Sequence, residues 1–179
     1  MYPYLKLIAT LVKARFRGRL TPQQSNVIHC RVGLSDIDPF GELNHARYLN
    51  YMELGRWDYV VRSGFFGVMR KNGWGVAVGG ASIRYRRRLA FLQKFTLTSE
   101  MLCHDGRWIY FLHEVHARGK ICASALLKVC TTSKQGLVPV PIVAEAMGMP
   151  DWGAQIPDWV QAWIDAEGQR PWPGSESIQ

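Results

Sequence analysis

Residues 35–56 read SDIDPFGELNHARYLNYMELGR, and this stretch joins a tight turn to a long helix. The turn is indicated by residue types that fix or permit sharp backbone bends: Asp36, Asp38, Pro39 and Gly41. Asn44 is a favourable helix N-cap, and apolar side chains then recur at helical spacing to about residue 63. Other apolar residues cover much of the remaining surface, so the sequence predicts a central helix that is buried on nearly all sides.

Segments typical of β-strands lie on both sides of this helix. Their alternating patterns predict one strand before the helix and four after it: residues 27–34, 81–89, 95–103, 108–118 and 121–132. Turn sequences at 104–106 and 118–120 join the last three strands into an antiparallel meander. This order predicts an α+β fold in which a five-stranded antiparallel sheet curls around one long helix.

Glycine is concentrated just before the second predicted strand, at Gly73, Gly75, Gly79 and Gly80. The spacing lacks G-x-G-x-x-G and no helix is predicted to follow, which argues against a dinucleotide site. We therefore expect the backbone here to approach another group closely.

The pattern Asp36-x-Asp38-x-x-Gly41-x-x-Asn44-x-x-x-Tyr48, with Glu53 and Arg56 after it, resembles a known family signature. It is similar to that of hotdog-fold acyl-CoA thioesterases of the 4-hydroxybenzoyl-CoA thioesterase type, and more closely to the branch called thioesterase superfamily member six. The resemblance covers roughly residues 26–140. It implies a hotdog fold and a hydrolase that cleaves an acyl-CoA thioester to free acid and coenzyme A.

Thioester hydrolysis needs a carboxylate nucleophile or a carboxylate-activated water, and hydrogen-bond donors for the oxyanion. The resemblance assigns the carboxylate to Asp38, next to the positive end of the helix dipole; the alternative is that Asp38 only stabilises the turn. Asp36 is interpreted as the turn-former. Glu42 stands where many relatives carry His, and three interpretations stay open: it is the base, it assists Asp38, or it faces solvent. Two neighbouring carboxylates would shift one pKa upward. Asn44 is a candidate catalytic donor or an N-cap.

The remaining site predictions concern the substrate. The helix start and the glycine-rich segment are candidate sources of oxyanion donors, and exposed Arg side chains are candidates for binding the coenzyme A phosphates. The predicted substrate-binding residues are Tyr48, Gly79, Gly80, Arg86 and Arg88. The Glu42 departure also leaves open an alternative function, a non-catalytic protein that binds acyl-CoA or lipid.

Composition limits the class of partner. The 179-residue chain carries a formal net charge of +8, which favours an anionic partner. The sequence contains no recognisable nucleic-acid-binding module, so we expect no nucleic-acid partner. It has no C-x-x-C pair and no two His on one face of a strand, so we expect no metal site. No cofactor is expected beyond the coenzyme A of the substrate. Four cysteines without such pairing suggest reduced thiols and a cytoplasmic location.

Two extensions flank the predicted 26–140 thioesterase-like domain. Residues 1–20 predict a basic amphipathic helix, too short to span a bilayer. Two interpretations stay open. The helix packs on the domain or on a partner subunit, or it binds peripherally to an anionic membrane surface. Residues 141–179 predict helices at 143–147 and 157–167 and a tail. Because a curled sheet leaves an open edge strand, and relatives cover it by dimerising, we expect a homodimer or a dimer of dimers.

Overall fold

The computed structural model describes residues 3–21, 23–149, 152 and 155–171. Its elements run in the order α1 (Tyr4–Phe16), β1 (Asn26–Arg31), a short 3-10 helix η1 (Leu34–Asp36), α2 (His45–Arg62), α3 (Phe65–Asn72), β2 (Gly75–Tyr85), β3 (Lys94–His104), β4 (Ile109–Ala117), β5 (Lys120–Ser133), β6 (Gly136–Val138), α4 (Val140–Ala146) and α5 (Asp158–Gln169).

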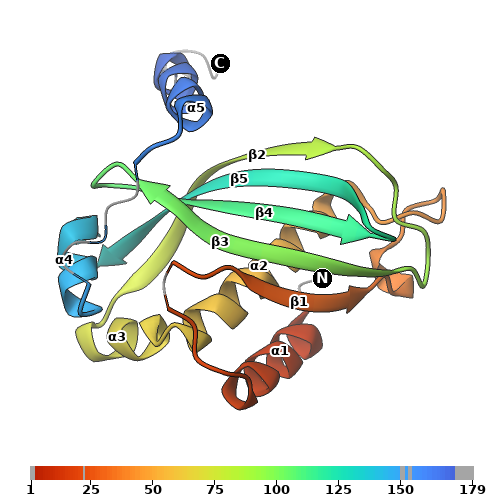
Figure 1. The fold of residues 1–179 in the computed structure, drawn as a ribbon, viewed down its shortest axis with the longest axis horizontal. Coiled ribbons are helices and arrows are strands. Elements are labelled where there is room, and N and C mark those ends of the chain that lie inside the picture. Colours follow the sequence, from red (N-terminus) through yellow and green to blue (C-terminus); the bar gives the residue numbers. More distant parts are fainter. Residues whose placement is uncertain (1–2, 22, 150–151, 153–154, 172–179) are drawn as a thin grey trace, which may run out of the picture.

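One antiparallel sheet forms the body of the molecule. Its strands lie in the order β1-β3-β4-β5-β2, and the short β6 pairs with β5. Figure 1 shows this sheet curving over the long helix α2, with α1 below β1 and α5 on the opposite side of the sheet. The predicted α+β arrangement is confirmed, with β6 as a sixth strand that the sequence analysis did not include.

Helix α2 begins and ends as its sequence indicates. The Asn44 side chain accepts a hydrogen bond from the backbone N–H of Ala46 at 2.9 Å, so Asn44 is the N-cap. The helix lies against β3 at Gly55, where an added Cβ would stand 2.4 Å from Ser99 Oγ and 2.9 Å from Leu97 Cδ2. Glycine is required at this crossing because the helix backbone approaches the sheet directly.

Strand β2 differs from the prediction. It spans Gly75–Tyr85 instead of 81–89, so the glycines belong to the strand and the arginines after Tyr85 do not. The strand ends there because the N–H groups of both Arg86 and Arg87 donate to the same carbonyl, that of Cys122. A close approach was predicted and is found: a Cβ on Gly79 would lie 2.3 Å from the ring of Trp108.

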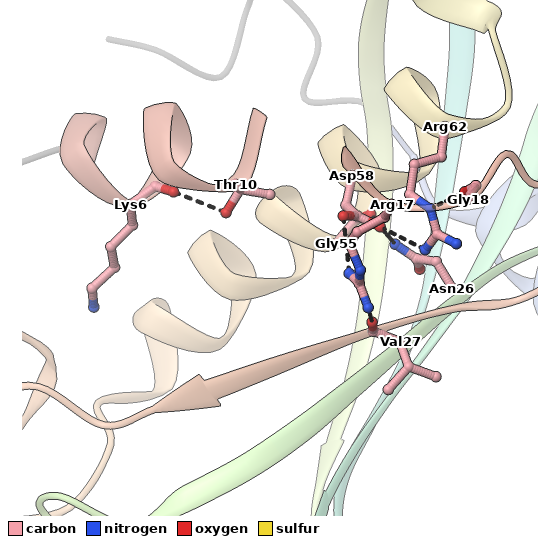
Figure 2. A network of polar contacts seen from close by, with 9 residues as sticks. All are labelled: Lys6, Thr10, Arg17, Gly18, Asn26, Val27, Gly55, Asp58 and Arg62. Atoms are coloured by element: carbon pink, nitrogen blue, oxygen red, sulfur yellow. Dashed lines mark hydrogen bonds and ion pairs between the residues drawn. The ribbon is translucent and has the colours of Figure 1, made fainter. Parts of the chain in front are cut away.

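Helix α1 is held to the domain by charged side chains. Arg17 donates to the Asp58 carboxylate at 3.1 Å and to the Val27 carbonyl at 2.7 Å, and Arg62 reaches the same carboxylate at 3.3 Å. Asn26 donates to Asp58 at 2.9 Å, as Figure 2 shows. Asp58 is only 1% exposed, so its charge is offset by these donors and not by water.

The smaller elements follow the predictions with shifted ends. β1 ends at Arg31, short of the predicted residue 34, because the chain turns into η1. α4 begins at Val140, three residues before its predicted start. α5 packs on the outer face of the sheet through buried Val160, and its Trp163 meets Tyr110 edge-on at 6.2 Å.

Candidate functional site

The turn before α2 fixes the Asp38 carboxylate. Oδ1 of Asp38 accepts hydrogen bonds from the backbone N–H of Phe40 at 2.9 Å and of Glu42 at 3.3 Å. The turn is closed by the Asp38 N–H, which donates to the Glu42 carbonyl, and by the Gly41 N–H, which donates to the Asp38 carbonyl. Both side-chain contacts fall on Oδ1. Within the described residues, Oδ2 is therefore left for water or a ligand.

Asp36 anchors this turn to the core. Its carboxylate is 3% exposed and accepts hydrogen bonds from the Lys6 ammonium, from the Tyr51 hydroxyl at 2.6 Å and from the Gly33 N–H at 2.9 Å. Burial alone would raise the pKa of Asp36, but these hydrogen bonds and the Lys6 charge hold that pKa below its ordinary value. The backbone of Asp36 also accepts from the N–H of Asn44, which ties the turn to the start of α2.

Glu42 is paired with an arginine. Its Oε1 lies 2.5 Å from Nη1 of Arg88, whose side chain is 79% exposed. Glu42 was interpreted as a base, a helper to Asp38 or a solvent-facing residue, and Arg88 as a phosphate ligand; the structure places the two in one ion pair beside the turn. Arg86 is also exposed, and it lies at the same end of the sheet because its N–H binds Cys122 of β5.

Tyr48 lies one turn into α2 and is 4% exposed, packed edge-on against Tyr85 with a ring separation of 5.1 Å. Burial raises the pKa of Tyr48 to about 12. The Tyr85 hydroxyl donates to the His45 carbonyl at 3.2 Å. The end of β2 therefore covers the first turn of α2, and Tyr48 contacts the core beneath it.

Gly79 and Gly80 are not brought to the turn within one protomer. They precede Tyr85 by five and six positions in the same extended strand, a separation of about 17–20 Å. Gly79 faces the ring of Trp108, and Gly80 faces the side chain of Lys128. The structure thus gathers Asp38, Glu42 and Arg88 and leaves the two glycines in the middle of β2, away from the turn.

An apolar cavity lies beside these glycines. It has a volume of about 270 Å³ and opens between the second half of α2, α3 and the β2 edge. Its wall carries the following apolar side chains among others: Trp57, Val60, Phe65, Met69, Val76 and Val78. Glu53 and Arg56 from α2 are also in the wall. The cavity begins about 14 Å along α2 from Asn44.

A family model described as the thioesterase-like superfamily matches residues 32–164, well over half of the chain. The chain belongs to the thioesterase-like superfamily. This match covers the turn, α2, the strands β2 to β6 and most of α5.

Individual proteins of related sequence or fold agree with this membership. The THEM6 protein of Xenopus laevis is 33% identical over 75 residues, which are 42% of this chain and only 36% of that relative's own length. The long-chain acyl-CoA thioesterase FadM of Escherichia coli strain K12 is 29% identical over 101 residues, covering 55% of this chain and 76% of FadM. The crystal structure of YbaW, a probable thioesterase from Escherichia coli, has a TM-score of 0.64 at 23% identity, covering 69% of this chain and 96% of that one. This likeness shows the shared fold, the hotdog arrangement that the motif implied.

One buried network of this thioesterase-like chain had no signal in the sequence. His113 of β4 is fully buried and lies 3.3 Å from Nη1 of Arg56 and 2.8 Å from Oγ of Ser99. Burial and the adjacent Arg56 charge hold the pKa of His113 well below its ordinary value, so the ring is neutral. Its partners come from α2 and β3, which local pattern does not reveal.

Metal binding has no structural support in the described part of the chain. Among those residues, no group of three His, Cys, Asp or Glu side chains is placed to hold a metal ion. The four cysteines are free thiols, and burial raises the pKa of Cys30 to about 12. In the same residues, no helix is both long enough and apolar enough to cross a bilayer.

Proposed function

We propose that this chain is an acyl-CoA thioesterase that hydrolyses an acyl-CoA thioester to the free acid and coenzyme A. The observation that carries the proposal is the Asp38 carboxylate, held by Oδ1 in the turn before α2 in a chain of the thioesterase-like superfamily. FadM, a relative, is named as a long-chain acyl-CoA thioesterase. The basic residues near the turn suit the anionic carrier.

In the proposed mechanism, Asp38 acts on the thioester carbonyl in one of two ways. Either its Oδ2 attacks the carbonyl carbon directly, giving an acyl anhydride on Asp38 that water then hydrolyses to the free acid, or the carboxylate takes a proton from the water that attacks the carbonyl. The positive end of the α2 dipole stabilises the oxyanion that develops, and the coenzyme A thiolate leaves. Arg86 binds a carrier phosphate, and Arg88 joins it when phosphate replaces Glu42 as its partner. Asn44 acts here as the N-cap that fixes the helix start.

The proposal includes a homodimer in which the β2 strands of two subunits pair at their free edges. At the other sheet edge, β1, two carbonyls already have partners: Arg17, just after α1, donates to the Val27 carbonyl, and the Tyr51 hydroxyl of α2 lies 2.8 Å from the Arg31 carbonyl. By contrast, residues 76–79 of β2 are exposed. Two β2 strands paired antiparallel about a two-fold axis bring the Tyr85 end of one protomer toward the Gly75 end of the other. Each turn then faces the partner's apolar cavity, which includes Gly75 and in which the acyl group lies.

The dimer makes a prediction for Ala77, an exposed edge residue that does not line the cavity. We expect Ala77→Lys to raise the dimer dissociation constant at least about tenfold, because like charges meet across the paired edges. Sedimentation equilibrium measures this, and Ile142→Lys, at an exposed position on α4, is the control. Equal dissociation constants for both variants would argue against a β2 interface.

A second function follows from the Glu42–Arg88 pair. Where many relatives carry His, this chain has a carboxylate already held by a guanidinium. That arrangement suits a non-catalytic protein that binds acyl-CoA or lipid, tethered at a membrane surface by its N-terminal helix. Such a protein would use the same apolar cavity without using Asp38.

Release of free thiol from short, long and aromatic acyl-CoA thioesters separates the two functions. We expect the wild type to turn over at least one class, and Glu42→Gln to change KM more than kcat, since Glu42 holds Arg88 and not the carbonyl. Acyl-CoA binding, measured by calorimetry on the same panel, serves as the control. Binding without any thiol release would favour the non-catalytic function.

A further inference from the structure

Two cations at the ends of helix α1, Lys6 and Arg17, are turned toward the domain. Lys6 contacts the buried Asp36 carboxylate, and Arg17 contacts the buried Asp58 carboxylate at 3.1 Å. Figure 2 shows Arg17 reaching across from the end of α1 to Asp58 on α2. These ion pairs join both ends of the helix to buried acids, so they set which face of α1 is turned outward.

The outward face of α1 is apolar. At three- and four-residue spacing it exposes a stripe of large side chains: Tyr4 at 65%, Leu5 at 85%, Ile8 at 57%, Val12 at 52% and Phe16 at 87%. Single exposed apolar residues are ordinary on protein surfaces, but a contiguous group on one helix face marks an interaction site. Ordinary amphipathic packing would place this face on the core.

From this geometry we infer that the outward stripe of α1 lies in the surface of an anionic lipid bilayer. Lys13 and Arg15 are exposed, and at about 100° per residue they stand on opposite flanks of Val12. An apolar stripe flanked by cations is the pattern of helices that lie in the membrane interface. The +8 net charge of the chain adds to this attraction. The α1 of a second copy would bring no anion to these cations, because Tyr4–Phe16 contains no Asp or Glu.

The contact would place the candidate site at the lipid surface. The Lys6–Asp36 pair sets the first turns of α1 beside the loop of residues 33–42, which itself exposes Leu34 at 75% and Phe40 at 85%. Asp38 lies in that loop. The docked chain therefore holds its Asp38 turn next to the bilayer, whether or not Asp38 hydrolyses a thioester.

Vesicle flotation tests this inference on the full chain. We expect the wild type to float with vesicles of phosphatidylglycerol and phosphatidylcholine, and much less with phosphatidylcholine alone. The double variant Leu5→Ser, Phe16→Ser should lose at least tenfold in its partition coefficient. Its control is Ile142→Ser, Trp159→Ser, an aliphatic and aromatic pair on α4 and α5 that is 49% and 50% exposed, and it should float like the wild type. Circular dichroism checks that all three are folded.

The other outcomes overturn the inference. Failure of the wild type to float with the anionic vesicles would do so, and so would equal loss in the two double variants. Sedimentation of the same proteins without lipid identifies the competing occupant: self-association that only Leu5→Ser, Phe16→Ser abolishes would assign the stripe to a second copy of the chain. Thioesterase activity is not part of the readout, so loss of the proposed function leaves this test intact.

Discussion

Asp36→Ala is expected to lower the free energy of unfolding by about 3 kcal/mol at neutral pH. The substitution removes a buried carboxylate and leaves hydrogen-bond donors around it without their acceptor. The Tyr51 hydroxyl keeps an acceptor, the Arg31 carbonyl at 2.8 Å. The Lys6 ammonium and the Gly33 N–H lose theirs. Lys6 is about one-third exposed and can be partly rehydrated, which keeps the cost below that of a fully buried pair. Urea unfolding of the full chain measures the change.

The control for this variant is Asp165→Ala, an exposed carboxylate that accepts from Gln161 on the same helix. We expect that change to cost less than about 0.5 kcal/mol. A similar loss in both variants would mean that the buried network does not stabilise the fold.

The effect of Asp36 should depend on pH in a defined direction. Its folded-state pKa is lowered from 3.8 by the hydrogen bonds that overcome its burial. A depressed pKa contributes stability that is fully present above the unfolded-state value and is lost as the pH falls through the folded-state value. The stability gap between wild type and Asp36→Ala should therefore be constant from neutral to mildly acidic pH and close below about pH 4.

The turn and α2 could be predicted because their signals are local. Asn44 is a cap by residue type, and the structure shows its side chain accepting from Ala46. The alternating strands and short turns gave the meander for the same reason. The end points of β2 could not be predicted, since they depend on where Trp108 and Cys122 meet the strand from other elements. Those residues are distant in the sequence.

The contacts of Asp36 and of helix α1 could be predicted only in part. Asp36 was interpreted as a turn-former, whereas its carboxylate receives Lys6 from a helix thirty residues away. Residues 1–20 were predicted to form a basic amphipathic helix, and in the structure its Lys6 and Arg17 turn inward to buried acids. A pattern of apolar and charged residues identifies an amphipathic helix. It does not say which face is outward when charged partners are buried in the domain.

Asp36 and Asp38 are two residues apart, and their carboxylates have different surroundings. One is buried and binds the core, and the other is held by a single oxygen at the turn. This difference predicts that the two positions respond differently to substitution. Loss at Asp36 acts on stability, and loss at Asp38 acts on chemistry.

Asp38→Asn should lower kcat by about 10²- to 10⁴-fold on whichever acyl-CoA the wild type hydrolyses. The amide oxygen of Asn can still accept from the N–H groups of Phe40 and Glu42, so the turn and the stability should be retained. The amide cannot act as a nucleophile or take a proton from water. Thiol release and acyl-CoA binding, measured on the same preparation, separate the two effects.

The informative comparison is between Asp38→Asn and Asp36→Asn. Both remove one negative charge from the same short loop, so a general loss of electrostatic attraction for the substrate would lower both activities alike. A chemical role for Asp38 predicts lost kcat with near-normal binding in Asp38→Asn, and retained kcat in the folded fraction of Asp36→Asn. Full turnover by Asp38→Asn would remove this carboxylate from the mechanism. Glu42, released from Arg88 when phosphate binds, would then be the carboxylate to test next.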